Sequence, residues 1–182
     1  MERYEDALRH LRAALDGDRD FTDARVNLGT ALLNMGRYAE AEEELRAAVG
    51  ISAHDALAWN SLGNALFHLA RLDEAIAAFE RAIAIEPGLV MALNNLGTAW
   101  REKGEVGKAE DAYRRALTMA PNHAEAWGGL GVLMREQGRY DEALAAQNRA
   151  LELKPSFNLA RFSRALLELG DGRSEEHTSE LQ

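Results

Sequence analysis

The chain has 182 residues, no cysteine, 47% hydrophobic residues and a formal net charge of −9 at pH 7. This composition is typical of a globular protein, and without cysteine neither a disulfide framework nor a cysteine-based metal site can form. An acidic chain lacks the positive potential that attracts nucleic acid or an anionic membrane surface, and no apolar run is long enough to span a bilayer. We therefore expect neither nucleic acid nor a membrane as partner.

A period of 34 residues runs through the chain. The only three prolines, Pro87, Pro121 and Pro155, have residue numbers that differ by 34. Three further columns keep the same step: Gly29, Gly63, Gly97 and Gly131; Ala41, Ala75, Ala109 and Ala143; and Ala48, Ala82, Ala116 and Ala150. Self-similarity at such a period is typical of a repeat protein, in which each unit is one supersecondary structure.

Each unit has the pattern of two amphipathic helices. In the second full unit, Trp59 and Leu62 belong to an apolar stripe on a first helix. The small residues Gly63 and Ala75 allow a second helix to approach it closely. Pro87 then ends the second helix, because the residue before a proline is disfavoured in helical dihedrals. One such hairpin cannot bury its apolar face alone, so we expect neighbouring units to stack around a continuous core.

These columns resemble the tetratricopeptide repeat. The second full unit carries most of that family's pattern, at Trp59, Leu62, Gly63, Ala75, Phe79, Ala82 and Pro87. The first unit departs from the pattern, with Arg25 at the tryptophan place and Ala53 at the proline place. The resemblance implies an all-α fold, namely a right-handed α-solenoid of stacked antiparallel helix pairs. It also implies a non-catalytic scaffold that binds other proteins.

In chain order, residues 1–21 supply only the second helix of a truncated repeat. Four full repeats follow, at residues 22–55, 56–89, 90–123 and 124–157. Residues 158–172 give the first helix of an incomplete repeat. Because neither end has the polar-faced capping helix that usually closes an array, we expect a piece of a longer protein whose true N-terminus is missing. The compartment then stays open, with the cytoplasm favoured.

The tail at residues 173–182, RSEEHTSELQ, differs from everything before it. It has one aliphatic residue and no helical periodicity, which predicts disorder. The string also resembles a common sequencing adapter translated in frame, so we interpret it as a non-native tail to be excluded from the fold. A genuine polar tail is the alternative.

No group of residues has the pattern of a catalytic or metal site. The five histidines are scattered along the chain and form no i, i+4 metal-binding pair. The string GGLG at residues 128–131 follows no strand and lacks the lysine of a phosphate-binding loop, so it indicates helix packing. We therefore expect no catalytic residue, no metal and no cofactor in this chain.

The first helices of a solenoid line its concave surface, and their positions outside the core are the candidate binding residues. We predict a peptide-binding groove formed by Asn27, Thr30, Asn60, Ser61, Asn64, Asn94, Asn95, Thr98, Arg101 and Arg135. An asparagine amide both donates and accepts hydrogen bonds, so a row of them can pair with the backbone of an extended peptide. The two arginines stand in equivalent places and could hold an acidic side chain. The alternative is that these polar residues only keep a groove soluble.

The resemblance also bears on the partner, which we expect to be a protein or peptide. The string NNLG at residues 94–97 is similar to the repeats of O-GlcNAc transferase, whose groove carries an asparagine ladder at the places of Asn27 and Asn95; Ser61 and Gly129 interrupt it here. The string ARFSRALLELGD at residues 160–171 resembles the last repeat ahead of the catalytic domain in some larger enzymes. The alternative function is therefore the substrate-recognition region of a larger bacterial glycosyltransferase or sulfotransferase. Chaperone-binding members of the family clamp a carboxylate with lysines. This chain has Val26 and other uncharged residues at those places, so we do not expect this kind of binding. Self-association through uncapped ends is a third expectation.

Overall fold

The computed structural model describes residues 2–18 and 21–179, and every regular element in them is a helix. The helices are α1 Glu2–Gly17, α2 Thr22–Asn34, α3 Tyr38–Ile51, α4 Ala56–His68, α5 Leu72–Ile85, α6 Val90–Glu102, α7 Val106–Met119, α8 Ala124–Glu136, α9 Tyr140–Leu153 and α10 Asn158–Ser179. They alternate between first helices (α2, α4, α6, α8 and α10) and second helices (α3, α5, α7 and α9), and α1 precedes this alternation. None of the described helices combines the length and apolar character needed to cross a membrane.

In each full repeat, the first helix packs antiparallel to the second helix, and a glycine sets how closely they approach. A Cβ on Gly29 would lie 2.5 Å from Leu45 Cγ, and one on Gly63 would lie 2.5 Å from Phe79 Cε1. At the same place on the next two first helices, Gly97 faces Tyr113 and Gly131 faces Gln147. The large side chain of the second helix thus occupies the volume that the glycine leaves free.

Helix α8 carries two more glycines because two further large side chains press against it. A Cβ on Gly128 would lie 2.5 Å from Phe157 Cε1, and one on Gly129 would lie 2.5 Å from Tyr113 Cε1. Gly128 and Gly129 are also buried within a helix. The packing interpretation of the string GGLG is therefore confirmed.

The turn between the two helices of each full repeat has one residue in the left-handed region. These residues are Gly36, Ala70, Gly104 and Gly138, with φ between 59° at Ala70 and 81° at Gly104. In the second repeat, the Ala70 amide donates to the Phe67 carbonyl and the Arg71 amide donates to the Leu66 carbonyl, both at 3.0 Å. This pair of bonds is a Schellman motif, which favours glycine at the left-handed position.

Replacing Ala70 with glycine is therefore expected to stabilise the protein. An L-residue other than glycine in this conformation costs about 1–2 kcal/mol, and the added flexibility of glycine in the unfolded chain offsets about half of the gain. We expect a net increase of about 0.5–1 kcal/mol in the free energy of unfolding, measured by chemical denaturation. Gly138→Ala at the equivalent turn should have the opposite sign, and equal effects of the two changes would contradict this explanation.

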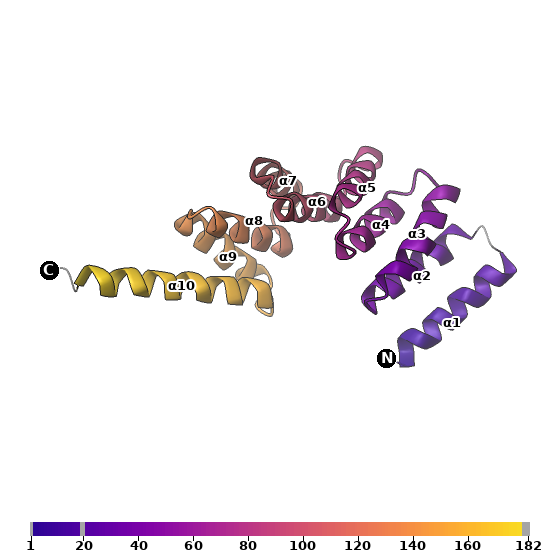
Figure 1. The fold of residues 1–182 in the computed structure, drawn as a ribbon, viewed down its shortest axis with the longest axis horizontal. Helices are drawn as coiled ribbons and strands as arrows, with labels where there is room; N and C mark the ends of the chain where they lie inside the picture. Colours follow the sequence, from indigo (N-terminus) through magenta and orange to yellow (C-terminus); the bar gives the residue numbers. More distant parts are fainter. Residues whose placement is uncertain (1, 19–20, 180–182) are drawn as a thin grey trace.

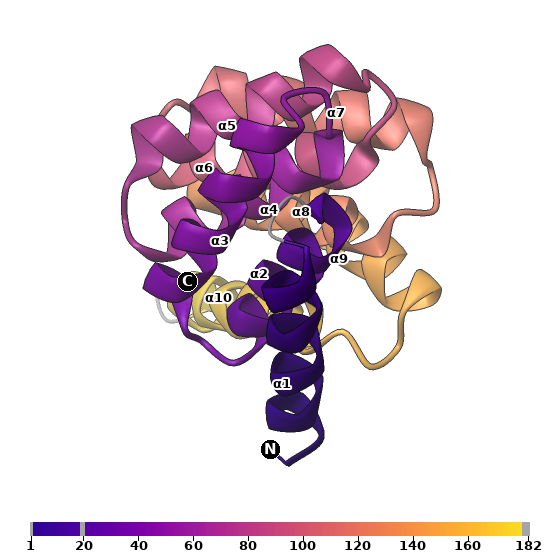
Figure 2. The same ribbon diagram turned by 90° about the vertical axis from the view of Figure 1, so that its right-hand side faces the viewer.

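The stack curves with its first helices on the inside. The backbones of α2 and α4, α4 and α6, α6 and α8, and α8 and α10 approach one another closely, whereas those of the second helices stay farther apart within the described residues. Helices that stay close on one side and separate on the other bend the stack into an arch, with α1 and α10 at its ends (Figure 1). From the end, α5 and α7 lie at the outer edge (Figure 2).

The last helix is longer than the sequence predicts. Helix α10 continues through Ser179, whereas the sequence predicts no helix beyond residue 172; residues 180–182 lie outside the described part of the chain. The prediction relied on the missing apolar periodicity. Helix formation also depends on intrinsic propensity, and this stretch contains good helix formers such as Arg173, Glu175 and Glu176 and no proline.

Candidate binding groove

The ten predicted groove residues all lie on the first helices α2, α4, α6 and α8. Asn27 and Thr30 on α2 are exposed, and most of the residues on the later helices are partly buried. The structure therefore brings the predicted residues onto the helices that form the inner side of the arch. Their surroundings differ from the expected row of free amides.

Three asparagines form a hydrogen-bonded cluster between α4 and α6. Asn95 Nδ2 donates to Asn60 Oδ1 at 3.0 Å, and Asn94 Nδ2 approaches Asn95 Oδ1 at 3.4 Å. Asn60 is only 6% exposed. The expectation that Asn60 faces solvent is therefore wrong, because α6 covers it and Asn95 occupies its carbonyl oxygen. The sequence does not show this, since it does not specify which face of α4 the next repeat covers.

Thr98 is also linked to the core of its repeat. Its hydroxyl donates to the Asn94 carbonyl at 3.2 Å and lies 3.0 Å from the hydroxyl of Tyr113 on α7. Tyr113 is 1% exposed, and its burial raises the pKa of the phenol above its ordinary value. Thr98 thus helps to satisfy the only polar group on a buried aromatic side chain.

The two groove arginines are not equivalent. Arg101 pairs with Glu102 and lies 3.7 Å from Glu136 on α8, so its charge is already balanced. Arg135 forms no ion pair within the described residues, and its Nε is buried without a hydrogen-bond partner. The predicted pair of acid-binding arginines is therefore reduced to Arg135.

Three exposed apolar residues on the first helices were not predicted. Leu57 on α4 and Met91 on α6 are each 49% exposed, and Leu159 on α10 is 48% exposed. They occupy the same repeat place, three residues before Asn60, Asn94 and Phe162, and residues three apart lie on the same helix face. We call these three residues the apolar row. Their spacing by multiples of 34 residues is a sequence signal that could have found them.

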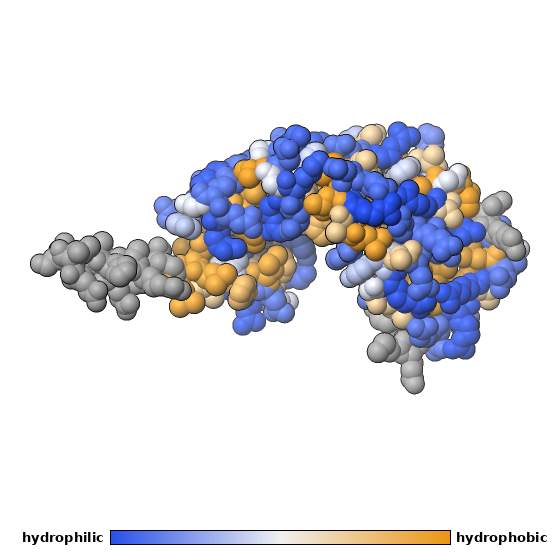
Figure 3. All heavy atoms as spheres, in the orientation of Figure 1, coloured by the Kyte–Doolittle hydropathy of each residue, from blue (hydrophilic) through white to orange (hydrophobic). Residues whose placement is uncertain are grey.

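The space-filling view agrees with this distribution of side chains. Apolar surface gathers on the described part of α10 and on the inner side of the arch near α6 (Figure 3). Helix α10 also exposes Phe162, Leu166 and Leu169. The inner surface is therefore mixed, with amides and hydroxyls beside large apolar side chains.

The outer surface carries two clusters of ion pairs instead. In the first, Arg71 lies 2.6 Å from Glu42 and 2.7 Å from Glu74, and Arg46 contacts the same two carboxylates. Two repeats later the same places hold Glu110, Arg114, Arg139 and Glu142. These outer ion-pair clusters join second helices whose backbones stay farther apart than those of the first helices.

The ion-pair clusters lower the pKa values of their carboxylates. The hydrogen bond from Arg71 lowers the pKa of Glu74, and that from Arg139 lowers the pKa of Glu142. Burial alone would raise the pKa of Glu42 and Glu110, but hydrogen bonds from two arginines each bring it below its ordinary value. Single ion pairs at a surface each contribute about 0–1 kcal/mol at neutral pH, and a network of several contributes more.

Acidification is expected to destabilise the protein through these carboxylates. A carboxylate whose pKa is lower in the folded state stabilises the fold above its unfolded pKa, which is about 4.3 for glutamate, and that stability is lost as the pH falls further. The thermal midpoint should therefore decrease between about pH 5 and pH 3. Glu42→Gln combined with Glu110→Gln should flatten this decrease, measured by circular dichroism; an unchanged slope would contradict the assignment.

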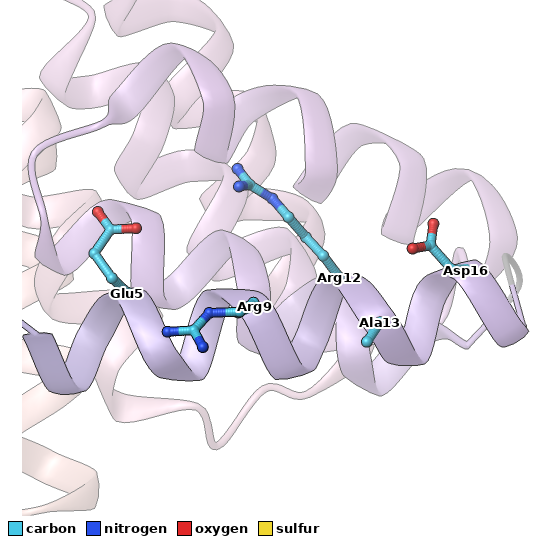
Figure 4. A pocket seen from close by; sticks show the side chains of 5 residues that line it. All are labelled: Glu5, Arg9, Arg12, Ala13 and Asp16. Carbon is cyan, nitrogen blue, oxygen red and sulfur yellow. The ribbon is translucent and has the colours of Figure 1, made fainter.

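A shallow pocket on α1 is lined by Glu5, Arg9, Arg12, Ala13 and Asp16. Figure 4 shows Glu5 and Arg12 pointing toward the neighbouring helices. Arg12 lies 3.6 Å from Glu40 and Glu5 lies 3.6 Å from Arg37, both at the start of the next second helix. These charges therefore join α1 to the array, and the pocket is not a candidate binding site.

The described residues contain no group of three or more histidine, aspartate or glutamate side chains placed to hold a metal ion. One histidine with a structural role is His123, whose Nδ1 accepts a hydrogen bond from the Ala126 amide at 3.1 Å and so caps α8. Its role is therefore to begin a helix.

Comparison with known proteins connects this architecture to a family. Models described as tetratricopeptide repeat match residues 1–65, 56–89, 86–124 and 94–158, which together span most of the chain. Among curated proteins, none matches the chain.

Several solved structures are similar to the chain. TTC0263, a thermophilic TPR protein of Thermus thermophilus, is 26% identical with a TM-score of 0.80, and 92% of each chain is covered. MamA is 28% identical with a TM-score of 0.73, covering 84% of this chain and 89% of MamA. YrrB, described as a TPR protein with an unusual peptide-binding site, is 21% identical with a TM-score of 0.70, covering 90% of this chain and 84% of YrrB. The predicted all-helical solenoid is thereby confirmed.

Proposed function

Since the chain belongs to the tetratricopeptide-repeat family, we propose that it is a non-catalytic interaction scaffold that binds an extended segment of another protein along the inner side of its arch. The observation that carries this proposal is the position of the predicted polar residues. They lie on the first helices, which remain in contact along the inside of the curve while the second helices separate. A continuous inner surface suits one long ligand better than several small ones.

The inner surface also has the chemistry that a peptide needs. Asn27 is exposed and Asn64 is partly buried, so both amides can pair with backbone groups of a ligand. Asn94 Oδ1 is buried and has no hydrogen-bond partner among the described residues, so it could accept a hydrogen bond after a small side-chain movement. YrrB, whose structure is described as having a peptide-binding site, offers a precedent for this class of ligand on a similar fold.

The alternative function, a substrate-recognition region of a larger glycosyltransferase or sulfotransferase, would gain support from an asparagine ladder along the groove. At the ladder place of α8, Gly129 is buried against Tyr113, and at that of α6, Asn95 is bonded to Asn60. Two of the ladder places are thus used for packing between repeats. We therefore favour the scaffold.

Removing the three available amides is expected to weaken peptide binding at least about tenfold. Each lost hydrogen bond should cost about 0.5–1.5 kcal/mol, and about 1.4 kcal/mol corresponds to a factor of ten. The experiment selects a binder from a peptide library with the chain, then titrates it against a variant with Asn27, Asn64 and Asn94 changed to alanine. Asn60 is left intact because its loss would leave Asn95 Nδ2 without its acceptor.

The matched control changes three exposed residues of the second helices, Glu43, Glu80 and Asn148, to alanine. It removes the same number of polar side chains from the outer surface. Both variants should keep the helical content and thermal midpoint of the parent. If the outer variant weakens binding more than the inner variant, the proposed groove is wrong.

A further inference from the structure

The apolar row specifies the ligand more closely than the polar residues do. Resting on the proposed scaffold function, we infer that the bound segment is extended, carries bulky apolar side chains three residues apart and has basic residues between them. The row consists of Leu57, Met91 and Leu159, each about half exposed at the same place of its first helix. Large apolar side chains held in register on a binding surface mark positions where a partner buries its own apolar groups.

The distance between neighbouring first helices sets the spacing of the ligand's side chains. Helices in contact, as α4 and α6 are, have axes roughly 8–10 Å apart. An extended chain of the polyproline II type rises about 3.1 Å per residue with three residues per turn, so every third side chain returns to the same side after about 9 Å. An apolar residue at every third position would therefore meet Leu57 and then Met91.

A helical ligand fits this surface less well. An amphipathic helix presents an apolar stripe about 100° wide. Polar residues flank the apolar row, with Asn64 on α4 and Asn95 and Thr98 on α6. A narrow apolar row beside amides matches an extended backbone, whose own N–H and C=O groups are unpaired and can bond to the amides.

Charge favours a basic ligand. The chain carries a net charge of −9, or −7 without residues 173–182, which hold one arginine and three glutamates, so its summed field attracts a positive segment. Within the groove, the charge of Arg101 is already balanced by Glu102 and Glu136. Lys154 is likewise paired with Glu125, at 2.7 Å. Glu125 stands on α8 at the repeat place that the apolar row occupies on the other helices. Acidic residues of a ligand would therefore meet little unbalanced positive charge apart from Arg135.

Four synthetic fluorescent peptides of equal length test the inference at about physiological salt. The first has leucine at every third position with lysine and serine between. The second has the same composition, with its leucines two residues apart in one stretch of the peptide. The third replaces lysine with glutamate, and the fourth replaces leucine with serine. The first peptide should bind at least about tenfold more tightly than each of the others.

Two double variants then locate the apolar contact. Leu57→Ser with Met91→Ser should weaken binding of the first peptide at least about tenfold. The control, Ile51→Ser with Met119→Ser, removes two equally exposed apolar side chains, 43% and 51% exposed, from second helices and should change affinity less than about threefold. Both variants should retain the parent's circular dichroism spectrum.

The outcomes separate this inference from the scaffold proposal. Equal binding of the first and third peptides, or of the first and second, would overturn the stated ligand while leaving the groove in place. Failure of all four peptides to bind would also overturn it, whereas the library selection would still test the scaffold. A larger loss from the Ile51 and Met119 variant would count against both.

Discussion

Gly97→Leu is expected to lower the free energy of unfolding by about 1–3 kcal/mol or more. A Cβ at this position would lie 2.8 Å from both Cδ1 and Cε1 of Tyr113, so even the first added carbon overlaps the ring. The ring cannot move toward α8, because it already lies against Gly129. The position that a Cβ would take there is only 2.5 Å from Tyr113 Cε1. The added side chain should therefore separate α6 from α7 and loosen the junction with α8.

The matched control is Gly107→Leu, the same substitution at a glycine of α7. A Cβ on Gly107 would have no neighbouring atom within 4 Å. Because glycine within a helix costs about 0.5–1 kcal/mol relative to alanine, this change should be neutral or slightly stabilising. The measurement is urea denaturation followed by circular dichroism. Equal midpoints for the two variants would show that the packing of α6 on α7 is described wrongly.

Tyr113→Ala should have the largest effect of any single change considered, a loss of about 3–5 kcal/mol by comparison with other buried aromatic residues. Tyr113 is 1% exposed, and its ring fills the space between Gly97 on α6 and Gly129 on α8. Both glycines leave room for this ring, so its removal creates a cavity that neither helix can fill. The loss should also reduce cooperativity, because Tyr113 joins two repeats.

Two further variants show which part of the loss is due to the hydroxyl and which part is due to the burial of the ring. Tyr113→Phe keeps the ring and loses the contact with Thr98, which should cost about 1 kcal/mol. Tyr140→Ala makes the same truncation at a tyrosine that is 59% exposed, and it should cost less than about 0.5 kcal/mol. A loss for Tyr113→Ala no larger than that for Tyr140→Ala would contradict the assigned role.

The sequence predicts the solenoid well because the same local pattern recurs. In each full repeat, a glycine on the first helix and a large residue 16 positions later, as in Gly63 and Phe79, specify one close helix crossing. Since the pattern returns every 34 residues, the local evidence for one pair applies to its neighbours. Contacts within a repeat can therefore be predicted from spacing alone.

Contacts between repeats are harder to predict, because they depend on how one pair is rotated against the next. The burial of Asn60 by α6 and the pairing of Arg101 with Glu136 both arise at such junctions. So does the second contact of Tyr113, with Gly129. Residue type alone favours asparagine and arginine as solvent-facing groups, and the rotation of neighbouring repeats changes which of them remain available to a ligand.

The most direct test of the inner surface as the binding site is to map the bound peptide on the isotope-labelled chain by NMR. The peptide selected from the library is added stepwise, and the shifts of the backbone amide signals are followed. The largest shifts are expected on first helices, at Leu57, Asn64, Met91 and Thr98. Largest shifts on the second helices instead, around Glu80 and Asn148, would show that the peptide binds the outer surface and would contradict the proposed function.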